Sequence, residues 1–138
     1  MTGRFRGRIA LVTGGSQGIG LAVVRRLLAD GATVVTCGRS RDKWDDAFAD
    51  DPRLAAVRFV PTDLTDREQL DALFDGIEED HGRLDLAVNN ASPALGSVGP
   101  TAEVDDADTR ATLDADLLAP LRCLRRELGL MASAAARS

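Results

Sequence analysis

The sequence predicts an α/β fold in which helices cover both faces of an open, doubly wound parallel sheet. Short apolar runs alternate along the chain with longer segments whose apolar residues recur at helical spacing. A run that is apolar throughout is typical of a strand buried on both faces, and strands that alternate with helices are joined by right-handed crossovers. A length of 138 residues suits one domain of this kind, so we expect a single domain over 1–138.

Composition excludes several classes of protein. Hydrophobic residues make up 44 % of the chain and charged residues 28 %, which is typical of a globular domain and not of a disordered segment. The net charge of −5 argues against a nucleic-acid partner, and no apolar stretch reaches the roughly 20 residues of a membrane span. Cys37 and Cys123 lack CxxC or metal-ligand spacing, so we expect reduced core thiols, a cytoplasmic location and no metal site.

The first strand is expected at 9–12, a continuous apolar run that ends before a glycine-rich turn. A helix follows, because Ile19, Val23 and Leu27 recur at helical spacing and Gly31 is placed to stop it. Residues 32–37 predict the second strand, and a helix is expected around Trp44 and Phe48. The third strand is predicted at 55–60.

The next helix has the clearest signal in the sequence. Thr65-Asp66-Arg67-Glu68 has the spacing of a capping box with Thr65 as the cap. The apolar residues that follow it at helical spacing are Leu70, Leu73, Phe74 and Ile77. His81 precedes Gly82 at the expected end of this helix, where an imidazole can cap carbonyls. Residues 84–88 predict the fourth strand, followed by a loop rich in Gly, Pro and Ser up to about Glu103.

A long helix comes last, with acids at its start and arginines nearer its end, as the helix dipole favours. Its apolar stripe consists of Leu113, Leu117, Leu121, Leu124 and Leu128. Pro120 predicts a kink or a local break. Because the sequence ends soon after this helix, we expect a sheet truncated after its fourth strand. That strand would be an exposed edge and the stripe would lack a covering, so self-association is expected.

The turn after the first strand indicates a dinucleotide site. It reads Thr13-Gly14-Gly15-Ser16-Gln17-Gly18-Ile19-Gly20 and lies between a predicted strand and a predicted helix. Gly14 would permit the tight turn, while Gly18 and Gly20 would let the backbone approach a pyrophosphate at the helix N-terminus. A turn in which the glycines serve the fold alone is the alternative.

The same segment resembles the TGxxxGxG motif of the short-chain dehydrogenase/reductase family, and Asn89-Asn90-Ala91-Ser92 resembles its NNAG motif. Asp63-Leu64 and Asp85 also lie where that family has acids. The resemblance runs from about residue 6 to about residue 131 and covers the N-terminal half of a typical member. It implies a Rossmann-like domain, incomplete in this chain, in which Asp63 contacts the adenine ring while Asn90 and Ala91 lie along the cofactor. The alternative for the two asparagines is a loop that bonds its own backbone.

Cofactor choice is predicted from the end of the second strand. An acid about twenty residues past the glycines would bind the ribose hydroxyls of NAD, but Gly38 occupies that position and Arg39 follows it. A guanidinium pairs bidentately with a phosphate, so NADP(H) is favoured over NAD(H). A solvated Arg39 in a turn with Ser40 is the alternative. The full predicted cofactor set is Gly14, Ser16, Gln17, Gly18, Ile19, Gly20, Arg39, Ser40, Asp63, Leu64, Asn90 and Ala91.

The resemblance fails in the catalytic half. The family uses a Ser, a Tyr-xxx-Lys pair and an Asn in the long helix, but this sequence has no tyrosine, and Lys43 is its one lysine. Asp116 occupies the probable Asn position, where an exposed helical acid is the ordinary explanation. We therefore predict no catalytic residues and no activity for this chain alone.

Two interpretations remain open. The first is the cofactor-binding part of an NADP-dependent oxidoreductase that acts on a small carbonyl or alcohol only in a full-length form. The second is a non-catalytic module that binds NADP or a protein partner.

Overall fold

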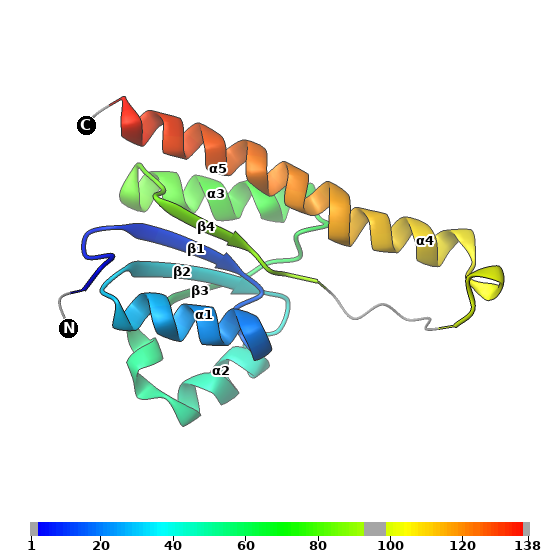
Figure 1. The fold of residues 1–138 in the computed structure, drawn as a ribbon, viewed down its shortest axis with the longest axis horizontal. Helices are drawn as coiled ribbons and strands as arrows, with labels where there is room; N and C mark the ends of the chain where they lie inside the picture. Colours follow the sequence, from blue (N-terminus) through cyan, green and yellow to red (C-terminus); the bar gives the residue numbers. More distant parts are fainter. Residues whose placement is uncertain (1–2, 93–98, 137–138) are drawn as a thin grey trace.

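The computed structural model describes residues 3–92 and 99–136, and these form a four-stranded parallel sheet with helices on both faces (Figure 1). The strand order is β3-β2-β1-β4. The strands are β1 (Ile9–Thr13), β2 (Thr33–Gly38), β3 (Arg58–Pro61) and β4 (Leu86–Asn89). All three strand pairs are parallel, so the predicted α/β, Rossmann-like fold class is confirmed.

Five α-helices flank this sheet in the described part of the chain. They are α1 (Gly18–Ala29), α2 (Arg41–Asp50), α3 (Arg67–His81), α4 (Asp106–Leu113) and α5 (Ala119–Ala135). Short 3₁₀ turns form η1 (Pro52–Ala56) and η2 (Thr101–Glu103). Figure 1 shows α1 and α2 on one face of the sheet and α3 and α5 on the other. Side chains of β1 alternate between two cores accordingly, with Ala10 and Val12 in the first and Leu11 in the second.

The third and fourth strands begin later than the sequence predicts. Residues 52–56 form η1 because Pro52 starts the turn and the Asp51 carboxylate accepts a hydrogen bond from the Arg53 backbone N–H. The strand predicted at 55–60 therefore occupies Arg58–Pro61. The strand predicted at 84–88 occupies Leu86–Asn89, and Leu84 is buried in the approach to it. Part of the predicted loop, residues 93–98, lies outside the described residues.

The cap of α3 is Asp66, so the prediction of Thr65 as the cap is wrong. One carboxylate oxygen of Asp66 accepts hydrogen bonds from the backbone N–H groups of Glu68 and Gln69. The Thr65 hydroxyl instead donates to the carboxylate of Asp63 over 2.7 Å. Aspartate beside threonine offered two possible caps one residue apart, and the carboxylate is the stronger acceptor. At its other end α3 stops at Gly82, which adopts a left-handed conformation with φ of 64°.

The last helical segment is broken, as Pro120 predicts. A turn of π-helix, η3 (Asp114–Leu118), separates α4 from α5, and the Ala119 N–H bonds to the carbonyl of Asp114, five residues back. Pro120 lies in the first turn of α5, where its missing N–H is tolerated. Figure 1 shows α4 and α5 continuing in the same direction, so the extra residue is absorbed without a sharp bend.

The two sides of the α4–α5 segment differ in what covers them. The face against the sheet consists of Ala115, Ala119, Cys123, Glu127, Leu130 and Ala134, all of them buried. The predicted leucine stripe lies on another face, where the exposed fractions run from 43 % for Leu121 and Leu124 to 55 % for Leu128. Within the described residues β4 pairs with β1 alone and forms an edge of the sheet. Both an open edge and an uncovered leucine face are therefore present, as the sequence predicts.

Candidate functional site

The glycine-rich turn joins β1 to α1 at the carboxyl end of the sheet. Gly14 and Gly18 have φ values of 70° and 56°, which favour glycine over any residue with a side chain. Gly20 is required for a different reason, since a Cβ there would lie 2.1 Å from the Gly14 carbonyl oxygen and 2.5 Å from Nδ2 of Asn90. The start of α1 is therefore packed directly against backbone, and its N-terminal N–H groups face the turn.

Asn90 fastens the turn to the end of β4. Its Nδ2 donates to the carbonyls of Thr13 over 3.2 Å and of Gly14 over 3.1 Å. In return the Thr13 hydroxyl accepts the backbone N–H groups of Asn90 at 3.0 Å and Ala91 at 3.1 Å. Among the residues that the structure describes, Asn90 thus bonds the neighbouring turn across 76 and 77 residues of sequence, whereas the alternative interpretation held that the loop bonds its own backbone.

A cavity of about 830 Å³ opens at this end of the sheet. Its volume lies within the 300–1,000 Å³ typical of small-molecule and cofactor sites. All of the predicted cofactor-binding residues except Gly20 line it, which are Gly14, Ser16, Gln17, Gly18, Ile19, Arg39, Ser40, Asp63, Leu64, Asn90 and Ala91. Gly20 lies beneath the cavity, packed against Gly14. The structure therefore brings together side chains and backbone from four separate stretches of sequence.

The side of the cavity formed by β2 and β3 carries charged groups of both signs. Asp63 accepts two hydrogen bonds from Thr65, and these bonds lower the pKa of the Asp63 carboxyl, with a smaller contribution from the positive charge of Arg39. The Asp63 backbone N–H donates to Oε1 of Gln69, which fixes the loop before α3. Arg39 is exposed at the mouth of the cavity, and Ser40 caps α2 by accepting the N–H of Lys43. A cationic group and a held carboxylate thus lie at one end of the cavity.

Asp116 lies in the π-turn and is exposed. Its carboxylate accepts a hydrogen bond of 2.9 Å from the hydroxyl of Ser92. Ser92 lines the cavity, whereas Asp116 does not. The residue at the probable catalytic Asn position therefore contacts the asparagine loop through Ser92 and does not itself reach the space enclosed by the site.

The opposite wall of the cavity was not predicted from the sequence. It is formed by small residues of α4, η3 and α5, namely Ala111, Ala115, Ala119, Pro120 and Cys123. A row of small residues four apart, at 111, 115, 119 and 123, was the available signal for a second face of this helical segment. The leucine stripe has a stronger apolar pattern, so the sequence analysis identified the leucine face of this helical segment and missed the face of small residues.

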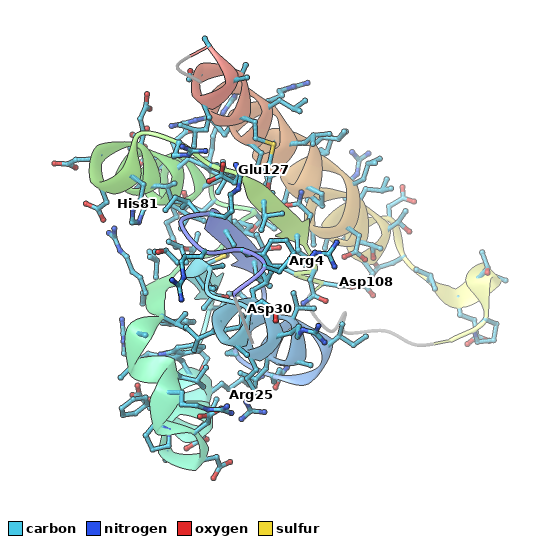
Figure 2. The ribbon with its side chains drawn as sticks, turned by 60° about the vertical axis from the view of Figure 1, so that its left-hand side comes forward. Arg4, Arg25, Asp30, His81, Asp108 and Glu127 are labelled. Carbon is cyan, nitrogen blue, oxygen red and sulfur yellow. The ribbon has the colours of Figure 1, made fainter. Side chains whose placement is uncertain are left out.

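Glu127 continues this row and is a buried acid that sequence analysis also missed. It is 1 % exposed, and Figure 2 shows it beneath α5, between the helix and the sheet. Its Oε2 accepts a hydrogen bond of 2.8 Å from Nδ2 of Asn89, while Oε1 has no hydrogen-bond partner among the described residues. Burial raises the pKa of the Glu127 carboxyl, and the bond from Asn89 opposes that rise.

The two cysteines are free thiols buried in the second core. Burial raises the pKa of Cys37 to about 11 and that of Cys123 to about 12, so both are protonated near neutral pH. A thiol in that state is a poor nucleophile. Cys123 thus serves the cavity as a small apolar wall.

Comparisons with known proteins place this geometry in context. The family model described as short chain dehydrogenase matches residues 8–137. The chain is 38 % identical over 130 residues to a 3beta-hydroxysteroid dehydrogenase of Mediterraneibacter gnavus, covering 94 % of this chain and 47 % of that protein. It is 40 % identical over 95 residues to an NADP-dependent (R)-specific alcohol dehydrogenase of Lentilactobacillus kefiri, covering 69 % of this chain and 38 % of that protein.

A solved structure of a short-chain type dehydrogenase/reductase from Mycobacterium ulcerans superimposes with a TM-score of 0.82 at 32 % identity, covering 95 % of this chain and 48 % of the other. The chain therefore spans about half the length, or less, of the relatives it matches. Among the described helices none is both long and apolar enough to cross a membrane.

Replacing Gly20 with Ala is expected to destabilise the fold by roughly 1–3 kcal/mol, because the new methyl group overlaps the Gly14 carbonyl and the Asn90 amide. The matched control is Gly129→Ala in α5, where a Cβ meets nothing within 4 Å and removal of a helical glycine stabilises by roughly 0.5–1 kcal/mol. Urea unfolding of both variants measures the difference. Equal effects of the two substitutions would show that the turn is not tightly packed.

Glu127 predicts a pH dependence of stability with a definite sign. Because the native pKa lies above that of the unfolded chain, the native state holds this proton more tightly, and stability is lost as pH rises through the native pKa. Glu127→Gln keeps an acceptor for Asn89 and cannot ionise. Urea unfolding between pH 4.5 and 8 measures the free energy of unfolding of both proteins. As pH rises, the stability of the variant is expected to increase relative to that of the wild type. Parallel stability curves for the two proteins would contradict this assignment.

Proposed function

We propose that this chain, which belongs to the short-chain dehydrogenase family, binds NADP(H) and is the cofactor-binding part of a carbonyl reductase or alcohol dehydrogenase. The observation that carries the proposal is the cavity at the carboxyl end of the sheet. Its lining unites the glycine turn, the Arg39 loop, the Asp63 loop and the asparagine loop. Open parallel sheets bind nucleotides at this position, next to the first strand and its turn.

The residues present fit a dinucleotide. The missing side chain at Gly18 lets a pyrophosphate approach the backbone at the start of α1, and the first turn of that helix adds a favourable dipole. Gly18 has open space where a Cβ would project, so the turn presents bare backbone to the cavity. In this proposal Asp63 and Leu64 hold the adenine end, and Asn90 and Ala91 hold the chain of the cofactor nearer the nicotinamide. The bound cofactor would supply hydride transfer.

The preference for NADP(H) rests on the residues at the end of β2 and just after it. Gly38 ends that strand where an acid would bind a ribose hydroxyl, and Arg39 offers a guanidinium to a 2′-phosphate. Lys43 lines the same part of the cavity and adds a second cation. The relative from Lentilactobacillus kefiri is itself named as NADP-dependent. The proposed cytoplasmic location rests on the two free thiols, which suit a reducing compartment.

We propose that this chain alone has no reductase activity. A carbonyl reductase must protonate the oxygen that becomes negative as hydride arrives, and the sequence contains no tyrosine to do so. Lys43 lies in the first turn of α2 beside Arg39, with no tyrosine for it to assist, and Asp116 accepts the Ser92 hydroxyl outside the cavity lining. Oxidation of NADPH by the pure chain with a panel of ketones and aldehydes, dependent on Gly18, would contradict the proposal.

A non-catalytic module that binds a protein is the second candidate. The exposed leucines of α4 and α5 favour it, because apolar side chains gathered on one helical face are typical of an interaction surface. The two candidates differ in what they require of the nucleotide cavity. A module of this kind keeps its partner when the cavity is blocked, whereas the oxidoreductase part loses its ligand.

NADPH is expected to bind at least several-fold more tightly than NADH, and Arg39→Ala is expected to narrow the gap chiefly by weakening NADPH. The control is Arg41→Ala, which removes the same charge two residues away. Arg41 lies over the ring of Phe59 and does not line the cavity. Calorimetric titration of the wild type and of both variants with each nucleotide measures the six affinities. Stronger binding of NADH by the wild type, or an equal effect of the two variants, would overturn the assignment.

The chain is expected to self-associate through its leucine face. Leu124→Glu places a charge in the middle of that face, so it should shift the weight-average mass toward the monomer. Ala72→Glu on the exposed side of α3 adds the same charge elsewhere and should leave the mass unchanged. Sedimentation over a wide range of protein concentration tests both variants. A wild-type chain that remains monomeric at every concentration would rule out the proposed association.

A further inference from the structure

A second, much smaller hollow lies between α3 and α5, on the outer side of the helical layer. Its volume is about 110 Å³, and its lining consists of Arg67, Leu70, Asp71, Arg122, Arg125 and Arg126. We call it the arginine hollow. None of these residues lines the cofactor cavity, although Arg122 and Cys123 are neighbours in sequence. The two sites therefore lie on different sides of α5.

Helical spacing explains why four arginines meet here. Arg122, Arg125 and Arg126 stand at positions i, i+3 and i+4 of α5, which places them on one face. Residues 67, 70 and 71 have the same spacing at the start of α3. Figure 1 shows the two helices running side by side over the sheet, so the two faces meet along one seam. Buried Leu70 is the apolar residue of the lining.

One of the four arginines is neutralised within the structure. Arg126 donates to Asp71 over 2.8 Å and to Asp75 over 2.5 Å, and its guanidinium lies 5.6 Å from the centre of the Phe74 ring. This arrangement holds α5 to α3 and accounts for the carboxylate of Asp71 in the lining. The Arg126 guanidinium is thereby fixed in place.

The other three arginines of the hollow differ from Arg126, which is held by two carboxylates. In the described part of the chain no carboxylate lies within ion-pair distance of Arg67, Arg122 or Arg125. Three positive charges without counter-charges therefore gather around one hollow, in a chain whose net charge is −5.

We propose that the arginine hollow binds a single phosphate group. Guanidinium groups pair bidentately with phosphate oxygens, and several of them around one point favour a dianion over a carboxylate. A volume of about 110 Å³ suits a single phosphate group better than a whole nucleotide.

Calorimetric titration of the cofactor-free chain with inorganic phosphate at low ionic strength tests the proposal. The double variant Arg122→Ala/Arg125→Ala is expected to weaken phosphate binding at least tenfold. Its control is Arg41→Ala/Arg110→Ala, which removes two charges outside the hollow and should change the affinity less than twofold. Absence of saturable binding by the wild type, or an equal loss in both double variants, overturns the proposal.

Asp71→Asn gives the proposal a test of opposite sign. It removes the one negative charge of the lining, while Asp75 still holds Arg126, so phosphate should bind several-fold more tightly. An unchanged or weaker affinity in a variant with wild-type thermal stability contradicts the proposal. A phosphoserine peptide that binds more tightly than inorganic phosphate identifies a phosphorylated protein as the source of the group, and equal affinities identify free phosphate. A dissociated assembly in the Arg122→Ala/Arg125→Ala variant would instead assign these arginines to contacts between copies of the chain.

Discussion

The close contact between the glycine turn and the end of β4 is the constraint on which the rest of the structure depends. Asn90 can donate to the Thr13 and Gly14 carbonyls only because Gly20 has no side chain to occupy that space. The contact fixes β4 beside β1, and it sets the start of α1 against the end of the sheet. Thr13, Gly14, Asn90 and Ala91 all line the cavity, so this contact fixes one of its walls.

The same end of β4 explains the position of α5. Asn89, next to Asn90, donates to Glu127, and this bond ties the last helix to the strand that carries the asparagine loop. A carboxyl taken out of water without charge compensation is costly, so α5 keeps it protonated more readily than an exposed acid would be. Small residues at 115, 119 and 123 let the helix approach closely enough for that bond to form. The same small residues therefore allow α5 to pack closely on the sheet and form the helical wall of the cavity.

Local signals predicted most of the fold and of the site, and long-range contacts account for the rest. The glycine turn, the loop after β2 and the asparagine loop each have a sequence pattern of their own, and their strands end at the same edge of a parallel sheet. The cap of α3 shifted by one residue because Thr65 and Asp66 compete for it, and η1 replaced the start of a strand at Pro52. The helical wall of the cavity escaped prediction because its small residues carry a weaker apolar pattern than the leucines.

The α4–α5 segment has two apolar faces, and only one of them packs against the sheet. A helix that packs against one sheet and meets water elsewhere needs a single apolar stripe. Here the stripe of small residues satisfies the sheet, yet the leucines remain about half exposed on another face. Burying a leucine side chain contributes about 1.5–3 kcal/mol of stability. A row of half-exposed leucines leaves much of that free energy unrealised unless a second surface covers them. A second copy of the chain packed on the leucine face would bury that stripe while the small residues stay against the sheet, as the proposed self-association requires.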